Sequence, residues 1–161
     1  MRRSHAMAIR DAKPEDAAAA CEVARRSIIE LCAADHGGDP EIVARWLANK
    51  TPENMGAWIA RPDASLLVAA EDGAILAVGM VSDAGEILLN YVSPSARFRG
   101  ISRALLKALE ARARERGAAI ATLESTQTAR RFYLSNGYVE TGAATMKFGM
   151  RSGYRMSKAL A

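Results

Sequence analysis

The chain has few of the side chains on which metal sites and disulfide frameworks depend. Its 161 residues include two cysteines and two histidines, and the histidines lie far apart, so no Cys/His cluster predicts a metal site. Cys21 and Cys32 fall in one predicted helix, where eleven residues separate them by roughly 16 Å, too far for a disulfide bond. We expect both to be buried structural thiols on one side of that helix, as is usual in a reducing compartment.

Long apolar runs are also missing. No stretch approaches the roughly 20 apolar residues that cross a bilayer, so we expect no membrane partner. Two arginines near the N-terminus have no apolar stretch behind them, and no secretion signal is predicted. We expect residues 1–6 to be a flexible leader, residues 1–161 to form a single domain, and the protein to be cytoplasmic.

Acidic side chains are fewer than basic ones, which leaves a net charge of +4. The basic residues are concentrated in one part of the chain: Arg97, Arg99, Arg103, Lys107, Arg112, Arg114, Arg116, Arg130 and Arg131. One interpretation is a solvated helix face, with Glu110 and Glu115 as partners. The other is attraction of a polyanion, either a nucleotide-like cofactor or nucleic acid.

Apolar periodicity predicts helices in the first third of the chain and strands after it. Asp39-Pro40-Glu41 and Thr51-Pro52-Glu53 each combine an N-cap residue, a proline at the first helical position and an acid, so they predict two helix starts. The expected elements are a strand at 8–10, helices at 17–34, 40–47 and 52–59, and strands at 66–70, 75–81 and 86–92. The short spacings between these last strands indicate an antiparallel meander.

The second half alternates between helix and strand. The expected elements are helices at 102–116 and 128–135, and strands at 119–124, 138–140 and 151–157. A meander followed by a strand–helix–strand crossover predicts an α+β fold, with a mixed β-sheet flanked by helices.

The most informative stretch is the junction from Arg97 to Ser102, where a strand ends, one glycine turns the chain and a helix begins. The first N–H groups of such a helix have no internal partners and point outward with the positive end of its dipole, where phosphate binds readily. Gly100 allows close approach of a ligand, and Arg97, Arg99 and Arg103 add charged donors. A tight turn with solvated arginines would give the same pattern.

Two motifs occur in order along the chain: Arg97-x-x-Gly100-x-Ser102, preceded by Val92-Ser93-Pro94, and Ala129-x-x-Phe-Tyr-x-x-x-Gly-Tyr138. Together they resemble the GNAT superfamily of acetyl-CoA-dependent N-acetyltransferases, in which Gly or Ala is usual at the position of Ser102. Ser125-x-x-x-Ala129 resembles a bacterial subgroup of unassigned substrate. With the strand opening at Ala8-Ile9-Arg10, the resemblance covers nearly the whole chain.

The resemblance implies how acetyl-CoA would be bound. The amides of Phe98, Arg99, Gly100, Ile101, Ser102 and Arg103 would hold the pyrophosphate, together with Arg97. The backbone of Tyr91 and Val92 would pair with the pantetheine amides as an added strand does. Thr126 stands three residues before the Ala of the second motif, where many members have Asn, and we count it with the cofactor-binding residues. No metal is expected.

Tyr133 is the residue that suits the chemistry of the reaction. When an amine attacks the thioester, a CoA thiolate leaves, and a phenol with a pKa of about 10 could protonate a thiol of pKa about 8.5. We therefore expect Tyr133 to be the general acid. The base that takes the proton of the amine is open: Glu86 is the first candidate, and Glu124, Asp35 and His36 are the alternatives.

The sequence does not specify the molecule that accepts the acetyl group. We expect acetyl transfer to a primary amine of a small molecule by direct attack. The alternatives are a protein or aminoacyl-tRNA N-acetyltransferase, with tRNA as the one nucleic-acid partner, and a CoA-sensing or nucleic-acid-binding domain without catalysis. A longer acyl donor and a homodimer are also left open.

Overall fold

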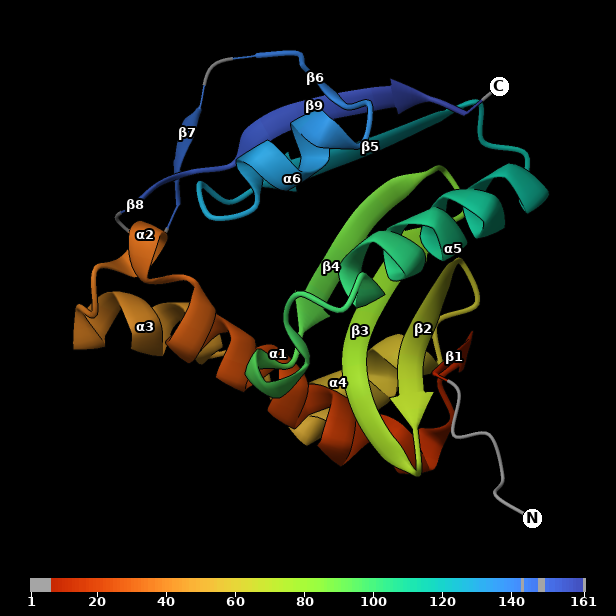
Figure 1. Ribbon diagram of the computed structural model, residues 1–161, viewed down its shortest axis with the longest axis horizontal. Coiled ribbons are helices and arrows are strands. Elements are labelled where there is room, and N and C mark those ends of the chain that lie inside the picture. Colours follow the sequence, from red (N-terminus) through yellow and green to blue (C-terminus); the bar gives the residue numbers. More distant parts are fainter. Residues whose placement is uncertain (1–6, 143, 148–149, 161) are drawn as a thin grey trace.

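A computed structural model describes residues 7–142, 144–147 and 150–160 of the chain. Its centre is a seven-stranded sheet in the order β1-β2-β3-β4-β5-β9-β6 (Figure 1). Neighbouring strands are antiparallel except β4 and β5, which run parallel. The predicted α+β fold, with a meander and one crossover in a mixed sheet, is therefore confirmed. The expected leader at 1–6 lies outside the described residues.

The elements follow the predicted order closely. The first part of the chain contains β1 (Ala8–Asp11), the 3-10 helix η1 (Pro14–Asp16), α1 (Ala17–Leu31), α2 (Ala33–His36), α3 (Pro40–Leu47) and α4 (Pro52–Ile59). Then come β2 (Ala64–Glu71), β3 (Ala74–Ser82), β4 (Glu86–Val92), η2 (Pro94–Ala96), α5 (Ile101–Glu115) and β5 (Ile120–Ser125). The chain closes with α6 (Arg130–Ser135), β6 (Val139–Glu140), β7 (Thr145–Lys147), β8 (Met150–Ser152) and β9 (Tyr154–Ala159).

Helix starts in the first part are fixed by their predicted caps. The Asp39 carboxylate accepts hydrogen bonds from the first-turn amides of α3, and the Thr51 hydroxyl accepts one from the amide of Asn54 in α4. Each cap satisfies amides that the helix itself leaves without a partner. Within the described ranges, no helix has the length and apolarity needed to span a bilayer.

Helices cover both faces of the sheet, because the inner strands point apolar side chains alternately toward one face and the other. Leu66 and Val68 of β2 pack with residues of α1 and α4, while Leu67 and Ala69 pack with residues of α5. Figure 1 shows the corresponding layers, with α5 in front of β2 and β3 and α4 behind them. The period-2 alternation of a strand explains why neighbouring residues serve opposite cores.

The parallel pair β4–β5 is joined only at its beginning. Glu86 pairs with Thr122 and Ile87 with Leu123, after which the two strands diverge (Figure 1). Gly85 allows β4 and β5 to approach each other at this joined end, which we call the closed end. Its φ is +93°, and a Cβ there would lie 2.3 Å from the carbonyl oxygen of Ile120. The sheet is thus split along part of its length, and the split opens toward α1, α5 and α6.

A β-bulge lies beside this opening. Met80 faces Leu89 on β4, but Val81 already faces Ile87, so Leu88 is an extra residue in the ladder. A bulge bends its strand and leaves the extra residue unpaired. The strand therefore turns away from β5 where the split begins.

Two predicted elements are shorter than expected. The first helix ends at Leu31, not near residue 34, because Cys32 leaves helical geometry (φ −103°, ψ 27°), and α2 follows separately. The strand expected over 151–157 is interrupted at Gly153, whose φ of +74° cannot continue a strand. The residues before Gly153 pair with β7 in a small two-stranded sheet that the sequence pattern did not predict.

Candidate active site between β4 and β5

A pocket of about 450 Å³ lies in the opening between β4 and β5. It is lined by β4, the loop after it, the first turn of α5, the end of β5, the region around α6, and the C-terminal part of α1. Of the site residues predicted from the sequence, those that line it are Tyr91, Val92, Arg97, Phe98, Gly100, Ile101, Ser102, Arg103, Thr126, Tyr133 and the alternative base Glu124. Arg99 and Glu86 are not among the lining residues.

One end of the pocket is the N-terminus of α5. Gly100 is the N-cap with φ +76°, it has no side chain to cap the helix, and the first turn carries no acidic residue. A Cβ on Gly100 would meet no protein atom within 4 Å. The first-turn amides have no capping side chain and carry the positive end of the helix dipole, in a stretch that lines the pocket together with Arg97 and Arg103.

Arg99 does not join this end of the pocket. Its guanidinium donates to the Glu71 carboxylate at 2.6 Å, and this ion pair holds it against the end of β2. The carboxylate also raises the pKa of Arg99. The sequence could not distinguish Arg99 from its neighbours, because the partner lies 28 residues away in the chain.

One wall of the pocket is the free edge of β4. β3 occupies the other edge of this strand, and pairing with β5 stops at Ile87. Among the residues that the structure describes, no strand pairs with β4 on that side beyond Ile87, so its backbone groups around Tyr91 and Val92 face the opening. An extended ligand with amide groups can add to such an edge as a strand does.

Tyr133 projects from α6 into the same pocket. Its phenolic oxygen accepts a hydrogen bond from Asn90 Nδ2 at 3.0 Å, which leaves the hydroxyl proton available for another acceptor. Burial raises the pKa of Tyr133 to about 12, and the hydrogen bond from Asn90 opposes that rise. The side chain is therefore a neutral donor near pH 7, held by a partner on β4.

Asn90 is a site residue that the sequence reasoning missed. It lines the pocket and donates a hydrogen bond to the phenol of Tyr133, the expected general acid. The available signal was a polar side chain in an otherwise apolar strand, Leu88-Leu89-Asn90-Tyr91-Val92. Its role depends on a contact with a residue 43 positions away, which no local pattern reveals.

The family of this chain is decided by comparison with known domains. Residues 32–160 match the family model described as an acetyltransferase (GNAT) domain, which spans both motifs and the whole pocket except the α1 wall before Cys32. The chain belongs to the GNAT acetyltransferase family. It is therefore an acyltransferase, and the opening between β4 and β5 is its candidate active site.

Solved GNAT structures resemble this one along nearly its full length. A GCN5-related N-acetyltransferase from Rhodopseudomonas palustris is 27% identical, with 94% of each chain covered and a TM-score of 0.83. The PaiA N-acetyltransferase of Thermoplasma acidophilum, solved with coenzyme A, is 22% identical, with 96% of this chain and 99% of that chain covered and a TM-score of 0.80. The ribosomal-protein-S18-alanine N-acetyltransferase of Escherichia coli is 19% identical, with 97% and 95% covered and a TM-score of 0.68. No curated protein matches the chain by sequence.

Two of the candidate bases in this GNAT domain differ in position. Glu124 lines the pocket at the end of β5, and Arg155 Nε lies 3.6 Å from its carboxylate. Glu86 is exposed at the closed end of the β4–β5 pair, on the first residue of β4. The split that forms the pocket begins only beyond Glu86, which explains why its carboxylate is not among the lining groups.

The other two candidate bases are engaged in hydrogen bonds. The His36 ring is buried; Nδ1 accepts from the amide of Gly38 at 2.9 Å, so Nε2 is protonated and donates to the carbonyl of Ile28 at 2.8 Å. The Asp35 carboxylate accepts from the amides of Gln127 and Thr128, at 2.7 and 3.1 Å. Both residues therefore fasten the α2 region, and Asp35 ties it to the loop before α6.

Thr126 and Cys32 also line the pocket. The Thr126 hydroxyl accepts a hydrogen bond from the amide of Ala129 at 3.1 Å and so ties the loop to the residue just before α6. Cys32 is a free thiol, as is Cys21, and both are buried as predicted. Burial raises the pKa of Cys32 to about 12, so its thiol stays protonated near neutral pH and is a poor nucleophile.

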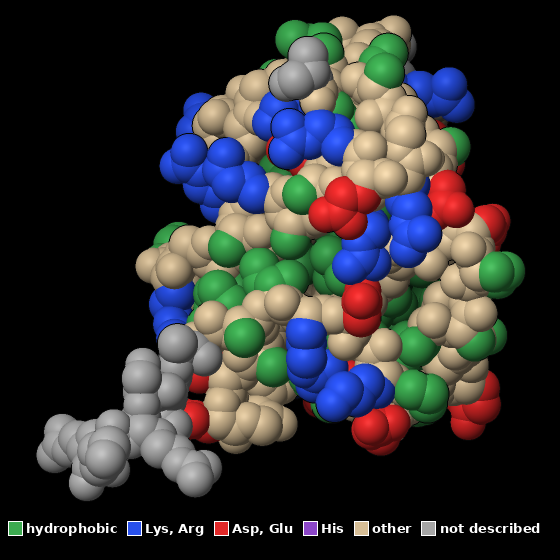
Figure 2. All heavy atoms as spheres, turned by 90° about the vertical axis from the view of Figure 1, so that its right-hand side faces the viewer, with side chains coloured by type: hydrophobic (Ala, Val, Ile, Leu, Met, Phe, Trp, Pro, Cys, Tyr) green, Lys and Arg blue, Asp and Glu red, His purple; other side chains and the backbone are tan. Residues whose placement is uncertain are grey.

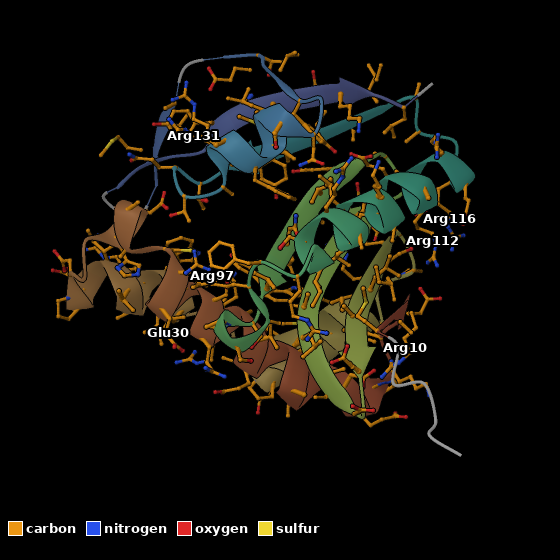
Figure 3. All side chains as sticks on the ribbon, viewed as in Figure 1. Arg10, Glu30, Arg97, Arg112, Arg116 and Arg131 are labelled. Carbon is orange, nitrogen blue, oxygen red and sulfur yellow. The ribbon has the colours of Figure 1, made fainter. Side chains whose placement is uncertain are left out.

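The many arginines of this GNAT domain do not form one surface. Figure 3 shows Arg112 and Arg116 at the C-terminal end of α5, far from Arg97 on the side toward α1. Arg112 pairs with Asp11 at 2.8 Å. On the face drawn in Figure 2, Lys and Arg groups are interleaved with Asp and Glu. Among the described side chains, no three His, Cys, Asp or Glu gather to hold a metal ion.

Proposed function

We propose that the protein transfers an acetyl group from acetyl-CoA to a primary amine of a small molecule by direct attack. The observation that carries the proposal is the alignment of three features along one opening. The N-terminus of α5 with Arg97 and Arg103, the edge of β4 and the Tyr133 side chain all line the same pocket. These match a diphosphate, a pair of pantetheine amides and a leaving thiolate.

Acetyl-CoA would be held mainly by the backbone. The amides from Phe98 to Arg103 would donate to the diphosphate, and the open space at Gly100 would admit it. The edge of β4 at Tyr91 and Val92 would pair with the pantetheine amides. Backbone groups freed by the bulge at Leu88 lie where the thioester would end, and an unpaired amide there could donate to the developing oxyanion.

Proton transfers would then be divided between two side chains. The amine nitrogen attacks the thioester carbon, a C–N bond forms, and the amine proton passes to a base. The C–S bond then breaks, and the leaving sulfur takes the hydroxyl proton of Tyr133. Asn90 stabilises negative charge that develops on the phenolic oxygen, because its amide donates to that oxygen. The protonated Cys32 thiol favours this direct route over an acetyl-cysteine intermediate.

Glu124 is the base that we propose in place of Glu86. Its carboxylate is in the pocket at the end of β5, whereas Glu86 lies at the closed end of the strand pair. A carboxylate there also attracts a protonated amine, which must lose a proton before it attacks. Arg155 Nε lies 3.6 Å from the Glu124 carboxylate, and both side chains are exposed, so the carboxylate stays accessible to an amine.

A small acceptor suits the side of the pocket that is lined by Cys32 and Thr128. The Asp35 carboxylate bonds the amides of Gln127 and Thr128, so α2 and the loop before α6 are fastened together next to Cys32. Two walls joined in this way limit the room for a folded protein or a tRNA end. A cytoplasmic location in a bacterium completes the proposal, because acetyl-CoA is the donor and both thiols are free.

An amine panel tests the proposal. The purified protein is incubated with acetyl-CoA and amino acids, polyamines, aminoglycosides or peptides, while CoA thiol release and acetylated product are followed. We expect one class of small amine to give both signals. Acetylation only of a proteome or tRNA pool would favour the macromolecular alternative, and CoA binding without transfer would favour a sensor. Absence of any thermal shift with acetyl-CoA would overturn the proposal.

A further inference from the structure

Phe98 has an unusual backbone and an unusual side chain. Its φ is +62°, and among the described non-glycine residues only Asp72, in the β2–β3 hairpin turn, shares a positive φ. Such a conformation is uncommon for a bulky residue and indicates strain that the surroundings must maintain. The ring is also 92% exposed, so packing into the core does not explain why a phenylalanine stands there.

A guanidinium lies beside one face of the ring, and the side chain is otherwise exposed. The Arg97 guanidinium lies over it, 4.6 Å from the ring centroid. The pair lines the pocket at the end next to Gly100 and the first turn of α5. A flat ring backed by a guanidinium and otherwise exposed is a surface on which a second planar group can stack.

The position of the pair selects the group that would stack. In coenzyme A the adenosine follows the diphosphate on the side away from the thioester. With the diphosphate on the α5 amides, the adenosine must leave the pocket past the loop, where Phe98 is exposed. Arg97 and Arg103 surround this end with positive charge, which suits an anionic nucleotide better than an apolar partner surface.

We propose that Phe98, backed by Arg97, is a stacking platform for the adenine base of coenzyme A. The inference rests on the proposed function, since it places the diphosphate at the start of α5. It assigns to the side chain a role beyond that of the Phe98 amide. The donor would then be recognised at three places: its pantetheine on β4, its diphosphate on the helix start, and its base on this ring.

The test compares coenzyme A with 4′-phosphopantetheine, which keeps the pantetheine and one phosphate but lacks the 3′-phosphoadenosine 5′-phosphate part. Dissociation constants for coenzyme A and for 4′-phosphopantetheine are measured by calorimetry with the wild type, Phe98→Gly, Phe98→Leu and Phe98→Tyr. Stacking of a base on an aromatic ring predicts a rise in Kd for coenzyme A of roughly tenfold in Phe98→Gly. Kd for 4′-phosphopantetheine should stay the same, and Phe98→Tyr should keep the tight binding of coenzyme A.

Controls separate stacking from folding and from the proposed function itself. Phe98→Gly relieves the positive φ, so its melting temperature should equal or exceed that of the wild type. Phe98→Leu keeps an apolar side chain without a π-face and should behave like Phe98→Gly. Equal effects on both ligands, or no effect on either, would overturn the platform. If the wild type bound neither ligand, the proposed function would fail before the platform was tested.

Discussion

Removal of the Tyr133 hydroxyl should separate chemistry from binding in this enzyme. Tyr133→Phe deletes one oxygen and keeps the ring, whose edge-on contacts with Phe132 and Tyr138 have centroid separations of 5.2 and 5.5 Å. Loss of a general acid costs about 10²- to 10⁴-fold in turnover. We expect kcat to fall by that amount, while Kd for acetyl-CoA changes less than about twofold. The one lost hydrogen bond, to Asn90, should lower the free energy of unfolding by only about 1 kcal/mol.

A substitution of Asn90 tests the role of Tyr133 independently. If Asn90 acts through the phenol, Asn90→Leu should lower kcat in the wild type by roughly tenfold, the factor that corresponds to about 1.4 kcal/mol. The same substitution should have little further effect when Tyr133 is already Phe, because the pair would act as one unit. The measurement is the single-turnover rate of CoA release, at saturating amine and donor, for the wild type, the two single variants and the double variant. Wild-type turnover in Tyr133→Phe, or multiplicative effects in the double variant, would refute the assignment.

Three further outcomes follow from named contacts. Glu124→Gln should lower kcat/KM by about 10²-fold, whereas Glu86→Gln should leave it within about twofold; initial rates with the reverse order would restore Glu86 as the base. Gly85→Ala should lower the free energy of unfolding, measured in urea, by at least about 2 kcal/mol, because the φ of Gly85 is +93° and a Cβ there would strike the Ile120 carbonyl. An unchanged urea midpoint would contradict this close approach of Gly85 to β5. Burial raises the pKa of Cys32 from 9.0 to about 12, so the unfolded state releases this proton first. The contribution of this thiol to the free energy of unfolding should therefore be constant below pH 9 and be lost between pH 9 and 12. Urea titrations at several pH values should show a smaller alkaline loss of stability for Cys32→Ala than for the wild type. Equal losses in the two proteins would exclude Cys32 as a cause.

Local signals were sufficient for most of the fold. Caps at Asp39 and Thr51, strand alternation and short turns identified the elements in their order, because each depends on neighbours in the chain. The interruption at Gly153 was not predictable. Glycine is permissive in strands and turns alike, and only the pairing of β8 with β7 explains why the chain breaks there.

The candidate site was predictable where it follows a motif and not where it depends on distant contacts. The loop from Arg97 to Arg103 and Tyr133 all lie in the pocket, except Arg99, which Glu71 draws away. Asn90 was missed because it acquires its role only when α6 packs against β4. The positions of Glu86 and Glu124 depend on where β4 and β5 part, which is a property of the sheet and not of either strand.

Hydrogen–deuterium exchange with and without coenzyme A tests most directly whether the opening between β4 and β5 is the donor site. We expect slowed exchange in two segments, the β4 edge over residues 88–92 and the helix start over residues 98–103, with little change near Gly85, where β4 and β5 are joined. Protection confined to other parts of the chain, or no protection at saturating coenzyme A, would show that this opening is not the donor site.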